Sequence, residues 1–123
     1  MSDEQPAYRL EDLQRELREF RDERDWAQFH DPKSLILALV GEVGELAELF
    51  QWIPADEAAA RFSEGLPKQR AEEEMSDVLI YLLGLANVLD IDLLAAARDK
   101  MAASRERFPS ESVTGVAPRK GGL

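Results

Sequence analysis

Two pairs of acidic residues, each pair three positions apart, are the strongest chemical signal in this sequence. The pairs are Glu42/Glu45 and Glu74/Asp77. On a helix, residues three apart have Cβ atoms about 5–6 Å apart, so both carboxylates of a pair can share one ligand. If the two helices pack side by side, the four carboxylates face each other, and like charges in a poorly solvated site repel strongly. The pattern therefore predicts a divalent cation between the pairs.

The ligand types narrow the choice of cation. Donor sets made only of oxygen suit Mg²⁺, Mn²⁺ or Ca²⁺. A di-iron site in a helical bundle uses Glu-x-x-His pairs, and neither pair contains a histidine, which also disfavours Zn²⁺. A single pair of this kind usually lies on a solvated helix face, so the prediction rests on two pairs that both interrupt apolar surfaces.

The apolar residues around the pairs recur at helical spacing. The first pair belongs to a stripe that also contains Leu35, Ala38, Leu49 and Trp52, and the second to a stripe with Tyr81, Gly84 and Val88. Beside them run two wholly apolar stripes, which we predict to be the main packing surfaces. Their residues are Ile36, Leu39, Val43, Leu46 and Phe50 in one, and Ala71, Met75, Val78, Leu82, Leu85 and Leu89 in the other.

The elements that carry these residues are predicted to be helices throughout. We expect helices over about Leu10–Phe29, from an N-cap at Ser34 to Trp52, over Asp56–Arg61, over Pro67–Leu89, and from an Asp92 cap to Arg107. The fold class is all-α, with four main helices in a bundle around one core. Residues 1–109 form the single predicted domain. Residues 110–123 are rich in Ser, Gly and Pro and are predicted to be a flexible tail.

Composition restricts the partners. The chain has 123 residues, 25 acidic and 15 basic, and a formal net charge of −10. So acidic a protein repels nucleic-acid polymers and anionic membranes, and we expect neither as a partner. No apolar run approaches the roughly 20 residues of a membrane span. The acidic N-terminus does not resemble a secretory signal, and there is no cysteine, so we expect a cytoplasmic protein.

The acidic pairs and their surroundings resemble a known family. Glu42-Val43-Gly44-Glu45 and Glu74-Met75-Ser76-Asp77 are similar to the E-x-x-E…E-x-x-D signature of the MazG-like all-α nucleoside triphosphate pyrophosphohydrolases. The segments Arg24–His30, Leu37–Trp52 and Ser76–Leu82 are similar to the dCTP pyrophosphatase branch, and the resemblance covers roughly residues 10–109.

The resemblance implies cleavage of a nucleoside triphosphate between its α- and β-phosphates, giving a monophosphate and pyrophosphate. The substrate it implies is a (d)NTP, with dCTP or a modified dCTP preferred. Glu42, Glu45, Glu74 and Asp77 would be the catalytic residues and would hold Mg²⁺, with Mn²⁺ as a substitute. Glu45 is our choice for the group that takes the proton from water. The family also implies a homodimer or homotetramer.

The resemblance further implies a set of substrate-binding residues. These are Trp26, Gln28, Phe29, His30, Trp52, Tyr81 and Lys100. Taken alone, the two tryptophans fit better as core or interface residues, and Lys100, like Arg105 and Arg107, fits equally well as a favourable charge near a helix C-terminus. Two positions depart from the family: Leu17 replaces a polar pocket residue, and Ser104 stands where members often carry asparagine.

Two alternatives to a dCTP-preferring enzyme stay open. The first keeps the chemistry but broadens the substrate to several normal or damaged (d)NTPs. The second is a non-catalytic helical module whose acidic stripe binds a cation for stability or pairs with a basic partner.

Overall fold

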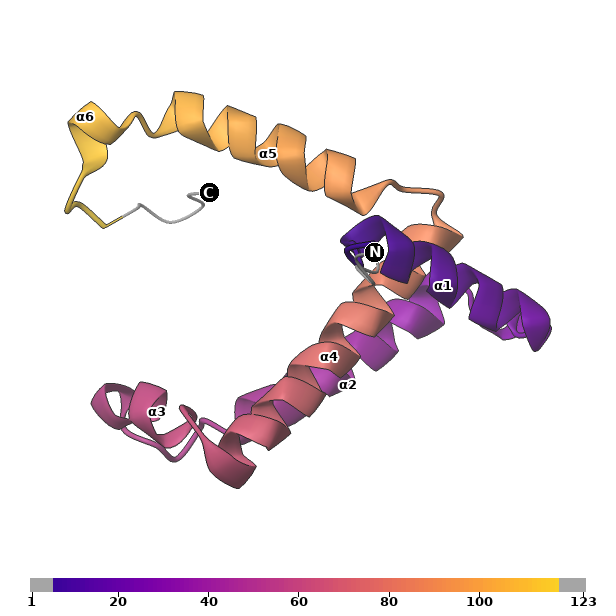
Figure 1. The fold of residues 1–123 in the computed structure, drawn as a ribbon, viewed down its shortest axis with the longest axis horizontal. Coiled ribbons are helices and arrows are strands. Elements are labelled where there is room, and N and C mark those ends of the chain that lie inside the picture. Colours follow the sequence, from indigo (N-terminus) through magenta and orange to yellow (C-terminus); the bar gives the residue numbers. More distant parts are fainter. Residues whose placement is uncertain (1–5, 118–123) are drawn as a thin grey trace, which may run out of the picture. The chain divides into compact units, whose positions relative to one another are not determined.

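The computed structural model describes residues 6–117, and every regular element in that range is helical (Figure 1). The elements are α1 (Leu10–Glu23), the 3₁₀ turn η1 (Ala27–Phe29), α2 (Pro32–Glu48), α3 (Ala55–Arg61), α4 (Gly65–Val88), α5 (Leu93–Arg107) and α6 (Ser110–Val113). The all-α prediction is confirmed. The chain forms two compact units, Met1–Asp90 and Ile91–Leu123, which are described separately. Their boundary falls inside the predicted domain 1–109, whose behaviour as one domain stays a prediction.

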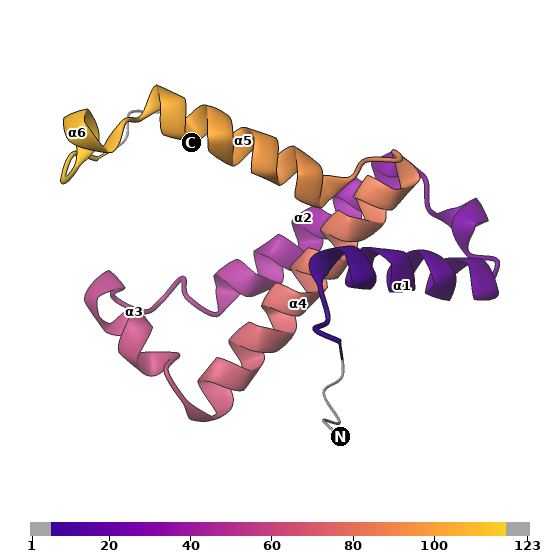
Figure 2. The same cartoon turned by 45° about the horizontal axis from the view of Figure 1, so that its top comes forward.

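In the first unit, α4 packs against both α2 and α1. Figures 1 and 2 show α2 and α4 side by side with opposite chain directions, and α1 beside the C-terminal half of α4. The short helix α3 lies in the connection between α2 and α4. Residues early in α2 are therefore paired with residues late in α4, which decides what lies near the acidic residues.

The buried core of this unit is small and differs from the predicted packing surfaces. Its buried apolar residues are Leu35, Leu39, Ala71, Leu83 and Ala86, and Leu83 is the fully buried one among them. Met75, Leu82 and Leu89, which we predicted to pack, are exposed, as are Ile36 and Val43 on α2 and Phe50 just after it. The prediction is wrong for these residues because the face of each helix that packs against its neighbours lies closer to the acidic stripe than we predicted. On α4 the covered stripe is Ala71, Glu74, Val78, Tyr81 and Leu85.

Several helix ends also differ from the prediction. α1 ends at Glu23, not near Phe29, because Asp25 adopts a left-handed backbone with φ of 52°. An aspartate tolerates this conformation better than most residues, and it turns the chain into η1. α2 is capped by Asp31 instead of Ser34: the Ser34 N–H donates to Asp31 Oδ1 at 2.9 Å, and Pro32 occupies the first turn. α2 also ends at Glu48, short of the predicted Trp52.

The second unit begins with the predicted cap. Asp92 accepts a hydrogen bond from the Ala95 N–H at 3.0 Å, and α5 ends at Arg107 as expected. α6 adds one helical turn within the predicted flexible tail, and residues 118–123 of that tail lie outside the described residues. Within the part of the chain that the structure describes, no single helix is long and apolar enough to cross a membrane; α4 and α5 pass that test only when they are taken together, by length and composition.

Candidate functional site

The antiparallel pairing of α2 and α4 brings three of the four predicted acids together. Glu42 and Glu45 of α2 and Glu74 of α4 each offer a carboxylate oxygen, and these oxygens lie within 4.8 Å of one another. Asp77 is exposed and lies outside this group of three. Its charge nevertheless contributes to the raised pKa of both Glu42 and Glu74, so it belongs to the same electrostatic site. We call these four residues the acidic cluster.

The electrostatics of the acidic cluster are unfavourable without a cation. Glu42 Oε2 and Glu74 Oε2 are buried and have no hydrogen-bond partner. Burial is the main cause that raises the pKa of each carboxyl, and the negative charge of Glu45 comes next. None of the ion pairs formed by the described side chains involves these acids. Unpartnered, half-buried carboxylate oxygens at this spacing fit a hard divalent cation.

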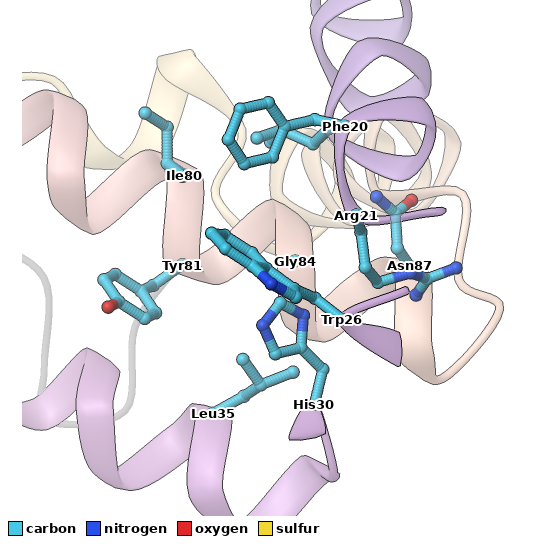
Figure 3. Close-up of a pocket in the computed structure, with 10 residues that line it drawn as sticks. Phe20, Arg21, Trp26, His30, Leu35, Ile80, Tyr81, Gly84 and Asn87 are labelled. Carbon is cyan, nitrogen blue, oxygen red and sulfur yellow. The ribbon is translucent and has the colours of Figure 1, made fainter. Parts of the chain in front are cut away.

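A cavity of about 270 Å³ lies between α1, η1, α2 and α4 (Figure 3). This volume is just below the usual range of about 300–1,000 Å³ for small-molecule sites, so it suits part of a ligand such as a base. Its lining is mostly apolar and aromatic. The residues are Leu17, Phe20 and Arg21 of α1, Trp26 and His30 beside η1, Leu35 of α2, and Ile80, Tyr81, Gly84 and Asn87 of α4.

Hydrogen bonds of Asn87 hold the α1 wall of this cavity against α4. The Asn87 side chain is buried, and its amide nitrogen donates to the backbone carbonyl of Gln14 at 3.0 Å. Its carbonyl oxygen accepts from the guanidinium of Arg18 at 3.2 Å. Phe20 and Trp26 then meet edge to face, with ring centroids 5.7 Å apart. Polar and aromatic contacts thus fix the position of the two rings.

The cavity and the acidic cluster are neighbours along the same two helices. Tyr81 follows Asp77 by four residues, which is about 6 Å at ~1.5 Å per residue. Leu35 precedes Glu42 by seven residues, which is about 10 Å along α2. A ligand whose ring occupied the cavity would therefore extend an attached chain of a few atoms to the carboxylates.

The structure groups some of the predicted substrate-binding residues and separates others. Trp26, His30 and Tyr81 line the cavity together. Gln28 does not line it and instead donates to the backbone carbonyl of Asp25 at 3.0 Å. Phe29 is also outside the lining and largely exposed. Of the seven predicted substrate-binding residues, only Trp26, His30 and Tyr81 therefore lie together at this cavity.

Trp52 and Lys100 are the most distant from that cavity in sequence. Trp52 follows the end of α2 opposite the cavity, and its side chain is 86% exposed. Lys100 lies on α5 in the second unit, where its backbone carbonyl accepts from Ser104 Oγ at 2.9 Å. Their roles as substrate contacts stay predictions.

Sequence reasoning missed most of the cavity wall. Leu17 entered only as a departure from the family pattern, Leu35 only as a member of the first acidic stripe, and Phe20, Arg21, Ile80 and Asn87 were not identified. Two signals were available. Gly84 in the interior of α4 and Asn87 in its last turn are poor helix formers, which often marks a position with another purpose.

The first unit is all-helical and carries a half-buried carboxylate cluster beside an aromatic cavity. The resemblance to the MazG-like family implies a site of this kind. Residues 30–111 match the MazG nucleotide pyrophosphohydrolase domain. The chain belongs to this family.

Curated proteins and a solved structure are similar to this chain over most of its length. dCTP pyrophosphatase 1 of Rattus norvegicus is 51% identical over 114 residues, which are 91% of this chain and 66% of that protein. The Homo sapiens protein of the same name is 51% identical over 107 residues, 85% of this chain and 62% of the relative. The chain thus spans a little under two thirds of the length of the curated relatives it matches. The crystal structure of a pyrophosphatase from Archaeoglobus fulgidus is 38% identical, with a TM-score of 0.72, and the match covers 88% of this chain and 99% of that one.

Proposed function

We propose that this protein hydrolyses a nucleoside triphosphate between the α- and β-phosphates, with dCTP or a modified dCTP preferred. The observation that carries the proposal is the order of two features along one antiparallel helix pair. An aromatic cavity sized for a base lies one to two helical turns from carboxylates spaced for a divalent cation. The relatives named dCTP pyrophosphatase 1 support cytosine as the base.

Mg²⁺, or Mn²⁺ in its place, is the cation we propose for Glu42, Glu45, Glu74 and Asp77. When bound, such a cation neutralises phosphate oxygens and makes the phosphorus more electrophilic. The unpartnered oxygens of Glu42 and Glu74 support this assignment, because they offer donors that nothing else in the described structure uses. The cation also resolves the charge conflict between a triphosphate and a chain with a net charge of −10.

The remaining steps fall to side chains of this chain. Trp26 and Tyr81 contact the base, since aromatic faces stack on bases with about 1–3 kcal/mol each. His30 lies in the same lining and offers polar ring atoms. Glu45, the exposed member of the triad of carboxylates, takes the proton from the attacking water. The water oxygen bonds to phosphorus, the bond to the bridging oxygen breaks, and monophosphate and pyrophosphate leave.

One assay separates this proposal from its alternatives. The protein is incubated with each (d)NTP and Mg²⁺, and the products are identified by chromatography. We expect pyrophosphate and monophosphate, with dCTP among the best substrates. Equal rates for several (d)NTPs would favour the broad-specificity enzyme, release of inorganic phosphate alone would show another hydrolase, and no turnover would leave the non-catalytic binding module.

A substitution tests the acidic cluster directly. Glu45→Gln keeps the shape of the side chain and removes its charge, so we expect turnover to be abolished while the circular dichroism spectrum stays helical. Glu48→Gln, three residues further along α2 at an exposed position, is the matched control and should keep activity. Near-normal turnover in Glu45→Gln would contradict the assignment of metal and proton transfer.

We also propose that the protein is a homodimer or homotetramer. α2 and α4 expose large apolar side chains, among them Leu37, Val40, Met75 and Leu79, and gathered apolar surface of this kind often marks an interface. A second copy of the same face is the simplest cover, since homo-oligomers with two-fold symmetry are the commonest. Such an assembly would also give Trp52 and Lys100 a route to a neighbouring copy's substrate. A cytoplasmic location stays a prediction from the cysteine-free composition.

A further inference from the structure

Arg24, at the end of α1, contacts the aromatic wall of the cavity without lining the cavity itself. Its guanidinium carbon lies over the Phe20 ring, 3.6 Å from the ring centroid, and 6.0 Å from the centroid of the Trp26 ring. A guanidinium stacked this closely on an aromatic face makes a favourable cation–π contact, and about 6 Å is the outer limit for one. Phe20 in turn meets Trp26 edge to face (Figure 3). The three side chains therefore form one contiguous group, which we call the arginine–aromatic stack.

The backbone at the end of α1 brings the two rings together. Asp25 has a left-handed backbone with φ of 52°, and its N–H donates to the Asp22 carbonyl at 3.1 Å. The Trp26 N–H donates to the Arg21 carbonyl at 3.0 Å. These two bonds are those of a Schellman motif, in which the residue two places past the C-cap commonly contacts an apolar residue of the last helical turn. Trp26 and Phe20 make that contact here, so the orientation of the Trp26 ring depends on what holds Phe20.

Arg24 supplies the hydrogen bond that the end of α1 lacks at Phe20. In a regular helix the Arg24 N–H would donate to the Phe20 carbonyl, four residues back. Here it donates to the Arg21 carbonyl at 3.3 Å instead. The guanidinium replaces the missing bond, since its Nη1 donates to the Phe20 carbonyl at 3.0 Å, and its positive charge is favourable at a helix C-terminus. One side chain thus holds Phe20 both by its backbone and by its ring.

We propose that Arg24 is a positioning residue that holds the Trp26 ring, through Phe20, in the orientation that stacks on the base. The inference rests on the proposed function, since it assigns the base to that ring. Without the guanidinium a smaller fraction of the protein has the ring correctly placed, and the apparent affinity for the nucleotide falls by the same factor. A cation–π contact of about 0.5–1 kcal/mol corresponds to about a two- to fivefold change at 1.36 kcal/mol per tenfold.

Fluorescence tests the position of the ring without any ligand. The chain has two tryptophans, so Trp52→Phe leaves Trp26 as the single emitter. In that protein, Arg24→Gln should make the Trp26 emission more readily quenched by acrylamide and should lower its anisotropy. Arg15→Gln is the matched control, because it removes the same charge from the exposed side of α1, where Arg15 pairs with Asp12 at 2.8 Å. The control should leave the Trp26 emission unchanged.

Steady-state kinetics separate positioning from simple attraction of the anionic substrate. Arg24→Gln should raise KM for dCTP about two- to fivefold and leave kcat unchanged. Arg24→Lys keeps the charge but lacks the planar group that stacks and donates at once, so it should not restore KM. In a Trp26→Ala protein, Arg24→Gln should cause no further loss, because the ring that it positions is gone.

Four results would each overturn the positioning role of Arg24. They are unchanged quenching of Trp26 in Arg24→Gln, an equal change in Arg15→Gln, full restoration of KM by Arg24→Lys, and additive losses when Arg24→Gln is combined with Trp26→Ala. The last two would show that Arg24 acts on the substrate by its charge. Increased quenching of Trp26 in Arg24→Gln, in a protein that hydrolyses no nucleoside triphosphate, would support the hold on the ring and refute the proposed function alone.

Discussion

Replacement of Asn87 by alanine should weaken the first unit because it removes the contacts that hold α1 on α4. The buried hydrogen bond to the Gln14 carbonyl, at 3.0 Å, is worth about 1 kcal/mol. The bond from the Arg18 guanidinium, at 3.2 Å, involves a charged donor but is only partly buried, so we assign it about 1–1.5 kcal/mol. Asn87→Ala should therefore cost about 2–2.5 kcal/mol of unfolding free energy. At ~4–8 °C per kcal/mol for a unit of this size, the melting temperature should fall by about 8–20 °C.

The assay is chemical and thermal unfolding of Asn87→Ala, Arg18→Ala and the double variant, all at one protein concentration because association would shift the midpoint. Arg18→Ala removes only the second bond and should cost about 1 kcal/mol. The double variant should lose little more than Asn87→Ala alone, which gives a coupling energy of about 1 kcal/mol.

Substrate affinity supplies a second readout from the same variants. Arg18 does not line the cavity, whereas Leu17, Phe20 and Arg21 on the same helix do. Arg18→Ala should therefore raise KM more than it lowers kcat, because it loosens the wall without touching the acidic cluster. A cost below about 1 kcal/mol for Asn87→Ala, or additive losses in the double variant, would refute the reasoning that Asn87 holds α1 in place.

Three further predictions follow from single contacts. Trp26→Ala should raise KM for the preferred nucleotide about 5- to 150-fold, because it removes one stacking contact with the base. Trp52→Ala should raise KM only if a neighbouring copy brings that ring to a substrate. Steady-state kinetics of both variants at several protein concentrations test these two expectations. Val40→Lys places a charge on the exposed apolar face of α2 and should lower the mass measured by light scattering, and an unchanged mass would exclude this face from the interface. Asp31→Ala should lower the melting temperature at pH 7. Hydrogen bonds from Ser34 hold the pKa of Asp31 below its ordinary value near 3.8, so the cap stabilises the protein above pH 3.8 and stops doing so as pH falls through the lower folded-state pKa. The difference in melting temperature between variant and wild type should therefore vanish at that low pH. A difference that stayed constant with pH would argue against a charged cap.

The sequence located the helices and the acidic cluster because both depend on periodicity. Residues three and four apart share a helix face whatever lies opposite, so Glu42 and Glu45 had to be neighbours. The pairing of α2 with α4 was only a condition of the prediction, and the structure meets it by packing the two helices in opposite directions, which brings Glu74 to Glu42 and Glu45. The helix ends were less accurate, because a single left-handed residue at Asp25 and a cap at Asp31 move a boundary without changing the apolar pattern.

The cavity was only partly predictable because it depends on a contact between residues far apart in the sequence. The spacing of Leu17 and Phe20 predicts an apolar face on α1, but it does not predict that this face lies against the C-terminal half of α4. That placement rests on Asn87, a buried polar residue whose partners lie 69 and 73 positions away. Family resemblance supplied Trp26, His30 and Tyr81, whereas Gln28 and Phe29 adjoin them in sequence but lie outside the lining.

The acidic cluster lowers the stability of the metal-free chain, and this supports a functional origin for it. Glu42 and Glu74 occupy the covered sides of α2 and α4, where an apolar residue would pack without repulsion. Their burial and the charge of Glu45 raise the pKa of both carboxyls, and a buried oxygen of each lacks a partner. A chain selected only for stability would lose these residues readily, since replacing unpaired buried charge with apolar groups is commonly neutral or stabilising. The same helix pair places the cavity beside the cluster, which supports the proposal that one ligand contacts both.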